Sequence, residues 1–202
     1  MPDYGWAEGP DWKEAWNEVM ALVGTDVMPD YLSEGADELE RSVIRRYLEP
    51  LELDCPLHYD REVAVAHGYP DIIAPYSGCA TWVSPPLWQP GEGAYYKTDN
   101  RNELPAFRVI TFPHIGPDVA ARVATDIETE FYGHFILGDK PYKKGCTLLA
   151  CSPKESGVGR GAFLTWESDV MSREGALLAQ IRTSLYYYVP RSLFEDASGE
   201  GE

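Results

Sequence analysis

His58 is the side chain in this sequence whose type and neighbours best suit acid–base chemistry. It lies in the stretch LELDCPLHYD (51–60), with Glu52 and Asp54 before it and Asp60 two residues after it. A histidine changes charge near neutral pH, and a carboxylate beside it can hold its ring as a general base. The same residues allow a plainer interpretation, in which His58 only caps a helix that starts near Asp60.

Other residues could also carry chemistry, and each has a structural alternative. Cys55 and His58 could form a nucleophile–base pair for acyl transfer, although two residues so close in a proline-containing turn need not face one another. His114 and His134 could belong to a site, or could be a loop histidine and a histidine on a strand face. The stretch GVGRG (157–161) resembles a phosphate cradle, but it lies between two expected strands, where a hairpin turn is more typical.

Composition indicates a folded protein and excludes several partners. Of the 202 residues, 44% are hydrophobic, which is enough for a core, and the length suits one compact domain. The 33 acidic and 17 basic residues give a net charge of −16, which repels phosphate backbones and anionic lipids. We therefore expect neither a nucleic acid nor a membrane as a partner. The basic residues that could still bind a charged carrier are Arg45, Arg46, Lys140, Lys143, Lys144 and Arg160.

The cysteines have spacings that match neither a metal site nor a Cys-x-x-Cys pair. No apolar stretch near the N-terminus resembles a signal segment, and no run is long enough to cross a bilayer. We therefore expect a cytoplasmic protein without a metal site, in which the thiols are reduced and behave as small buried hydrophobes. The cysteines are Cys55, Cys79, Cys146 and Cys151.

Helical periodicity predominates in the first half of the chain. Asp11 and Glu14 make a capping-box pattern at the start of the first expected helix, and Gly24 ends it. Asp37 and Glu40 make a second such pattern. The expected helices cover 11–24, 37–49, 61–67 and 77–83.

The second half of the chain has the period-two pattern of strands. A long loop over 85–105 precedes it, rich in proline, glycine and asparagine, and carries Trp88, Tyr95 and Tyr96. Turns at SGVGRG and SREG join the last three strands into an antiparallel meander. The expected strands cover 107–112, 122–137, 145–154, 160–171 and 177–189.

Helices followed by an antiparallel sheet make an α+β protein. We expect one domain over 36–192, in which a curved sheet wraps around the helix at 77–83. A helical extension over 1–35 precedes the domain, and a disordered acidic tail over 193–202 follows it. Because an open sheet has exposed edges, we also expect it to pair with a second copy or a similar chain.

Three stretches support a more specific interpretation. They are IRRYLEPLELDCPLHYDREVAVAHGYPDIIAP (44–75), KPYKKGCTLLA (140–150) and GAFLTWESDVMSREGALLAQIRTSLYYYVP (161–190). In this order they resemble the MaoC-like hot-dog hydratases and dehydratases, especially their N-terminal dehydratase domain of the fungal fatty-acid-synthase type. The resemblance implies a single hot-dog fold and (R)-specific hydration of an enoyl thioester, or dehydration of a 3-hydroxyacyl thioester. It implies a substrate carried on coenzyme A or acyl carrier protein, and no metal or other cofactor.

The resemblance also implies roles for particular residues. His58 stands at the position of the family's catalytic histidine. Leu53 occupies the position of the family's aspartate, so Asp54 is the nearest acid that could support the histidine. Pro75 occupies the position of a glycine whose N–H binds the thioester oxygen, and proline has no N–H to donate. The expected substrate-binding residues are Tyr76, Ser77, Gly78, Trp82 and Lys143.

Alternatives remain open for these residues and for the function. Trp82 could line an acyl pocket or belong to the core, and Lys143 could bind a phosphate or only end an exposed strand. The chain could be a hydratase or dehydratase, or a subunit of one, in a homodimer or heterodimer with a second MaoC-like chain. Leu53 and Pro75 favour a non-catalytic subunit that binds the acyl thioester. A hot-dog thioesterase is the third possibility, and release of free thiol from an acyl-CoA would identify it.

Overall fold

A five-stranded antiparallel sheet forms the centre of the computed structural model, which describes residues 3–93, 107–111 and 114–194. The strand order is β1-β5-β6-β7-β4. The strands are β1 (Leu32–Glu34), β4 (Ala121–Phe131), β5 (Tyr142–Glu155), β6 (Gly159–Met171) and β7 (Leu177–Pro190). β2 (Phe107–Thr111) and β3 (His114–Val119) pair in a separate two-stranded sheet. The expected α+β class is confirmed.

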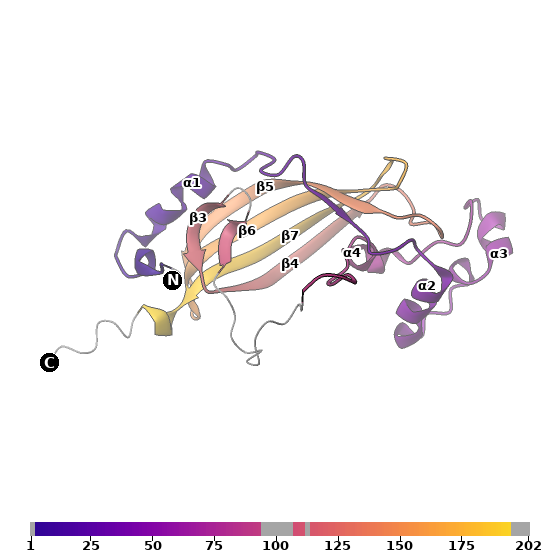
Figure 1. The fold of residues 1–202 in the computed structure, drawn as a ribbon, viewed down its shortest axis with the longest axis horizontal. Coiled ribbons are helices and arrows are strands. Elements are labelled where there is room, and N and C mark those ends of the chain that lie inside the picture. The colour runs from indigo at the N-terminus through magenta and orange to yellow at the C-terminus, as the bar shows by residue number, and fades with distance from the viewer. Residues whose placement is uncertain (1–2, 94–106, 112–113, 195–202) are drawn as a thin grey trace.

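The helices are short and gather at the two ends of the sheet (Figure 1). One end carries α1 (Asn17–Met20), and the other carries α2 (Arg41–Leu48), α3 (Arg61–Ala66) and α4 (Cys79–Trp82). Single 3₁₀ turns are η1 (Gly5–Ala7), η2 (Trp12–Trp16), η3 (Glu49–Leu51), η4 (Pro56–His58), η5 (Tyr76–Gly78) and η6 (Arg191–Leu193). In the described ranges, no helix has the length and hydropathy needed to cross a bilayer.

The long strands β5, β6 and β7 form the predicted meander. In the β5–β6 turn, Ser156 N donates to Gly159 O over 2.9 Å, so GVGRG is a hairpin turn and not a phosphate cradle. Gly161 is required near the start of β6, because a Cβ would lie 1.9 Å from the carbonyl oxygen of Tyr187 on β7. The β6–β7 turn closes where Ser172 N donates to Ala176 O over 2.8 Å.

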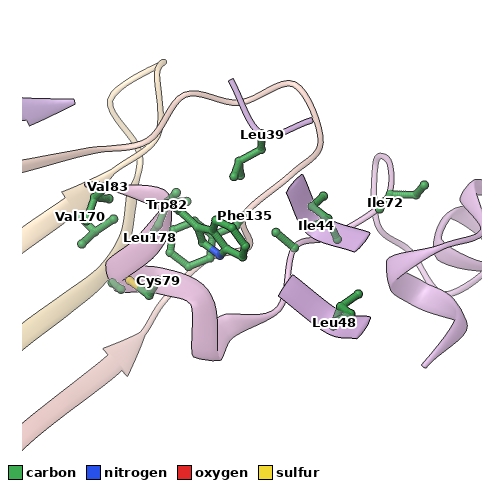
Figure 2. Close-up of a cluster of buried hydrophobic side chains, with 12 residues drawn as sticks. Leu39, Ile44, Leu48, Ile72, Cys79, Trp82, Val83, Phe135, Val170 and Leu178 are labelled. Atoms are coloured by element: carbon green, nitrogen blue, oxygen red, sulfur yellow. The ribbon is translucent and has the colours of Figure 1, made fainter. Parts of the chain in front are cut away.

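One face of the sheet carries hydrophobic clusters at both of its ends. The β6–β7 register places Ala162, Leu164 and Val170 on this face, because alternate residues of a strand share a face. Ala162 and Leu164 pack with the N-terminal segment, whereas Val170 packs with α2 and α4. Figure 2 shows the second cluster, with Trp82 beside Phe135 and Leu178. The expected helical cover is therefore present, but α4 covers only one end of the sheet.

The N-terminal segment differs from the single helix expected over 11–24. It forms η2 and then α1, and the side chain of Asp11 makes no capping hydrogen bond. The buried rings of Trp12 and Trp16 explain the difference, since each packs against Trp6, with ring centroids 6.5 and 5.6 Å apart respectively. Tertiary packing of these rings overrides the local helical pattern.

The second expected helix begins later than predicted. α2 starts at Arg41, and neither the predicted box at Asp37 nor the side chain of Glu40 caps it. Residues before α2 are held elsewhere, because Leu39 N donates to Asp139 O over 2.7 Å. The expected strand over 122–137 also ends early, at Phe131, since the chain then leaves the sheet to pack beside the segment that precedes η5.

Other expectations lie close to the observed elements. α3 starts after Asp60 as predicted, and its carboxylate accepts hydrogen bonds from the N–H groups of Glu62 and Val63. η5 and α4 occupy almost the range predicted for the fourth helix. Tyr95 and Tyr96 of the predicted loop lie outside the described residues, as does most of the predicted tail. Phe194, near the start of that tail, is buried against Ala7 and Val189.

Candidate active site

His58 is held by a backbone carbonyl at the end of η4. Its Nδ1 lies 2.7 Å from the carbonyl oxygen of Ile73. Since a carbonyl oxygen only accepts hydrogen bonds, Nδ1 carries a proton, so the lone pair of the neutral imidazole lies on Nε2. The backbone supports this arrangement, because Ile73 N donates to Leu57 O over 3.3 Å. The ring is therefore fixed in the tautomer that a general base needs.

The two acids that precede His58 do not support its ring. Asp54 and Glu52 are exposed, and within the described part of the chain neither makes a hydrogen bond or ion pair with His58. The turn is instead held by the hydroxyl of Tyr59, which donates to Leu53 O over 2.9 Å. The Ile73 carbonyl therefore takes the orienting role that the sequence suggested for Asp54. The proposed helix-capping role of His58 is wrong, because Asp60 caps α3.

His58 lines an open cleft of about 450 Å³ together with residues of α2. Arg41 and Arg45 bring two guanidinium groups to this cleft, and Ser42 and Tyr59 complete its lining. Arg41 Nη1 donates to Tyr59 O over 3.3 Å, and Arg45 pairs with Glu49 at 2.9 Å. Glu49 therefore partly neutralises Arg45, and Arg41 carries most of the positive charge of the cleft. Its chemistry suits an anionic ligand beside the imidazole.

A second titratable pair lies at the start of η5. The hydroxyl of Tyr76 makes a short hydrogen bond with Nδ1 of His134. The ring of Tyr69 packs edge-on against His134 at 4.8 Å, and that of Phe131 lies 4.8 Å from Tyr76. Burial, and to a smaller degree Tyr69, raises the pKa of Tyr76, so its phenol is neutral at physiological pH. His134 lies beyond the end of β4 and is not on a strand face.

The other predicted residues of η5 and α4 divide into exposed and buried ones. Ser77 is exposed in the first turn, where N–H groups have no partner within the helix. Trp82 is 3% exposed, packs 5.1 Å from Tyr47, and donates from Nε1 to Pro75 O over 3.0 Å. A Cβ on Gly78 would lie 2.2 Å from the indole of Trp82. The structure thus places Trp82 in the core (Figure 2), and Gly78 is buried against it.

Lys143 lies on β5 directly opposite Val170 of β6. The two side chains therefore share the face of the sheet that carries the hydrophobic clusters. Its ammonium sits 5.9 Å from the centroid of the Tyr31 ring. Within the described residues, no hydrogen bond or ion pair joins Lys143 to His58 or Tyr76. Of the predicted site residues, His58 lines its cleft, Tyr76 and Ser77 lie in η5, and Lys143 lies on β5, where its charge acts on Cys79 of α4.

The cysteines do not form a nucleophilic site. Burial raises the pKa of Cys79 to about 12 and those of Cys146 and Cys151 to about 11, which leaves protonated, unreactive thiols. In the described ranges, no hydrogen bond joins Cys55 to the His58 ring, so the proposed Cys–His pair has no support. Nor does any group of three or more His, Cys, Asp or Glu residues there lie close enough together to hold a metal ion.

Known sequences match most of the chain. The family model of the FAS1-like, dehydratase domain region matches residues 22–181. A probable enoyl-CoA hydratase alpha subunit from Thermomonospora curvata is 24% identical over 157 residues, which are 78% of this chain and 47% of that protein. This chain thus spans about half the length of the curated relative that it matches.

Solved structures share the fold. The crystal structure of the ChsH1-ChsH2 complex from Mycobacterium tuberculosis contains a chain that matches with a TM-score of 0.61 at 17% identity, over 89% of this chain and 92% of that one. A MaoC-like dehydratase matches with a TM-score of 0.50 at 15% identity, over 85% of this chain and 43% of that one. At such identities the likeness shows the fold alone, and that fold is the expected hot dog.

Proposed function

This chain belongs to the family of FAS1-like dehydratase domains, and from that premise we propose that it is a subunit of an enoyl-thioester hydratase or 3-hydroxyacyl-thioester dehydratase. The observation that carries the proposal is the ring of His58. Its Nδ1–H is fixed on the Ile73 carbonyl, and the ring lines the basic cleft formed with Arg41 and Arg45. A histidine in a fixed tautomer beside an anion-binding cleft suits proton transfer to and from an acyl thioester.

In the hydration direction, Nε2 of His58 takes a proton from a water molecule, and the oxygen of that water forms a bond to C3 of the enoyl thioester. Negative charge develops on the thioester oxygen. The proton on His58 then passes to C2, on the same face of the double bond as the new C3–O bond. Dehydration runs these steps backwards. The Ile73 carbonyl stabilises the imidazolium by accepting from Nδ1–H, which a carboxylate would do more strongly.

The thioester oxygen needs hydrogen-bond donors where its charge develops. Pro75 supplies none, so we assign this role to the start of η5. The N–H groups of Tyr76 and Ser77 and the exposed hydroxyl of Ser77 are the donors of this turn. The basic side chains of the cleft, Arg41 and Arg45, would bind the phosphates of coenzyme A or of a phosphopantetheine carrier. We give the phosphate role to these arginines and not to Lys143, which lies on β5 and does not line this cleft.

Crotonyl-CoA hydration tests the proposal. The loss of enoyl-thioester absorbance is followed for the wild type, His58→Ala and Asp54→Asn, and calorimetry measures crotonyl-CoA binding by each. We expect His58→Ala to lower kcat by about 10²–10⁴-fold with little change in binding. Asp54→Asn should leave kcat within about twofold, because Asp54 does not contact the ring. Equal kcat in the wild type and His58→Ala would refute the assignment.

A second candidate, a non-catalytic subunit that binds the acyl thioester, is favoured by two observations. His58 has no carboxylate partner among the described residues, and Pro75 has no N–H to donate. This candidate predicts that the chain binds crotonyl-CoA without turning it over, and that Arg41→Ala with Arg45→Ala abolishes binding. A thiol-release assay on the same samples separates both candidates from a thioesterase, since only a thioesterase frees the thiol.

A further inference from the structure

The carbonyl of Ile73, which holds the His58 ring, belongs to a short extended segment that lies between two neighbours. On one side, residues 72–74 pair with residues 135–137 through two backbone hydrogen bonds of 2.9 and 2.7 Å. On the other side, Ile73 N donates to Leu57 O over 3.3 Å, and Ile73 O accepts from Nδ1 of His58 over 2.7 Å. The imidazole thus takes the place of a backbone donor, and its tautomer depends on where this segment lies.

The contact between this segment and the turn that carries His58 has little backbone support. The hydrogen bond from Ile73 N to Leu57 O is long, because the usual separation of an amide nitrogen and a carbonyl oxygen is about 2.9–3.0 Å. The bonds to residues 135–137 hold the far side of the segment and do not reach η4. A further link is therefore needed to keep Ile73 O within reach of the ring.

Asp71 supplies such a link at the start of the segment. Its Oδ1 accepts from Ile72 N over 2.7 Å, and its Oδ2 accepts from Arg61 Nε over 3.1 Å. Arg61 is the first residue of α3 and follows His58 by three positions, and Asp71 precedes Ile73 by two. The ion pair therefore closes the α3 loop and joins the two stretches of chain that carry the ring and its acceptor.

The carboxyl group of Asp71 is ionised and belongs to the electrostatics of the site. The N–H of Ile72, and to a smaller degree Arg61 and Arg41, lower its pKa below the usual value, although partial burial opposes this shift. Arg41 also lines the cleft. The side chain of Asp71 is 30% exposed and is tied to its neighbours, whereas Asp54 is exposed and does not contact the ring.

We propose that Asp71 is a positioning residue for His58. Through Arg61 and the N–H of Ile72, it keeps the Ile73 carbonyl on Nδ1, and so leaves Nε2 free to accept a proton. It acts on the ring through the backbone, in place of the direct carboxylate contact that the ring lacks among the described residues. The inference rests on the proposed function for its effect on catalysis, whereas the position of the ring proton can be measured without substrate.

The tautomer of His58 tests the proposal directly. Nitrogen–proton correlation spectra of the imidazole groups are recorded at about pH 8, where neutral rings predominate, and His58→Gln assigns the signals of this ring. We expect the wild type to carry the proton on Nδ1. In Asp71→Ala the ring loses its fixed acceptor, so we expect a mixture with the tautomer that carries the proton on Nε2.

A second variant keeps the test decisive if Asp71→Ala does not fold. Arg61→Gln breaks the ion pair but leaves the bond from Ile72 N to Asp71, and exposed ion pairs contribute little to stability. We expect a smaller shift of the tautomer in the same direction. The matched control, Glu38→Ala, breaks another exposed ion pair, with Arg173 at 2.6 Å, and should leave the imidazole signals unchanged.

Kinetics then show whether the position of the ring matters for turnover. We expect Asp71→Ala to lower the kcat of crotonyl-CoA hydration about tenfold, with KM within about twofold, because a misplaced base slows proton transfer more than it weakens binding. An Nδ1–H tautomer that stays the same in Asp71→Ala and Arg61→Gln would overturn the inference, even where the wild type hydrates crotonyl-CoA. A shifted tautomer in a chain without hydration activity would support the positioning role and count against the proposed function alone.

Discussion

The two ends of the sheet are built in different ways. At the end where β5 turns into β6, the core is formed by tryptophan rings and fixed by Arg160, whose Nη1 donates to Ala7 O over 2.7 Å. At the other end, a second hydrophobic cluster packs α2 and α4 onto the sheet, and single polar contacts hold the candidate residues, such as the hydrogen bond from His58 to Ile73. The comparison indicates that hydrophobic packing stabilises both ends, whereas only the helical end also positions groups for chemistry. Substitutions at the tryptophan end should therefore change stability without touching the candidate site.

The largest expected effect on stability is at the tryptophan end. Trp16 is fully buried, so Trp16→Ala should lower the free energy of unfolding by about 3–5 kcal/mol, because a cavity forms and apolar contacts are lost. Denaturant unfolding measures this change. Trp88→Ala is the control, since Trp88 is 48% exposed and should cost less than about 0.5 kcal/mol. A loss below about 1 kcal/mol for Trp16→Ala would show that the packing of this end contributes little to stability.

A smaller effect is expected for the Tyr76–His134 pair. Tyr76→Phe removes the phenol that bonds to His134 and should cost about 1 kcal/mol of stability at pH 7. Tyr69→Phe, whose ring only packs against His134, is the control. Equal losses in the two variants would mean that the Tyr76 hydroxyl bond contributes nothing.

The pH dependence of the same variant gives an independent check. In the folded chain, burial raises the pKa of Tyr76 above its usual value near 10. A raised pKa adds stability that is present in full below pH 10 and is lost as the pH rises through the folded-state pKa. The wild type should therefore lose more stability than Tyr76→Phe above pH 10. The reverse order in urea titrations at several pH values would contradict the assignment.

The helical end also contains a matched pair of acids. Asp60→Ala removes the cap of α3 and should cost about 1 kcal/mol, because two N–H groups lose their acceptor. Asp54→Ala should leave stability within about 0.5 kcal/mol, since Asp54 is exposed and makes no contact with His58. Thermal unfolding of both variants measures the difference. A cost for Asp54→Ala as large as that for Asp60→Ala would show that Asp54 supports the turn.

The sequence predicted the elements whose causes are local. The meander follows from strand alternation and turn residues, and the cap at Asp60 follows from the residue itself. The segment over 11–24 was not predictable in the same way, because its shape depends on where the Trp16 ring packs. The α+β class followed from the order of helices and strands, whereas the hot-dog assignment and the expected catalytic role of His58 came from the family resemblance.

The partners of the site residues had no local signal. His58 bonds to the backbone carbonyl of Ile73, which any residue type would supply, so no sequence pattern marks it. Tyr76 and His134 are 58 positions apart and meet only because the chain leaves the sheet after β4. The burial of Trp82 likewise depends on the close approach that Gly78 allows. Such contacts between distant segments can be read only from the folded chain.

The central claim is that His58 performs proton transfer from a ring held on the Ile73 carbonyl. The most direct measurement is the kcat of crotonyl-CoA hydration by the wild type and by His58→Ala, assayed under identical conditions. Our account predicts a fall of about 10²-fold or more with unchanged crotonyl-CoA binding. A kcat that is the same for both would contradict it and leave this chain as the substrate-binding half of the enzyme.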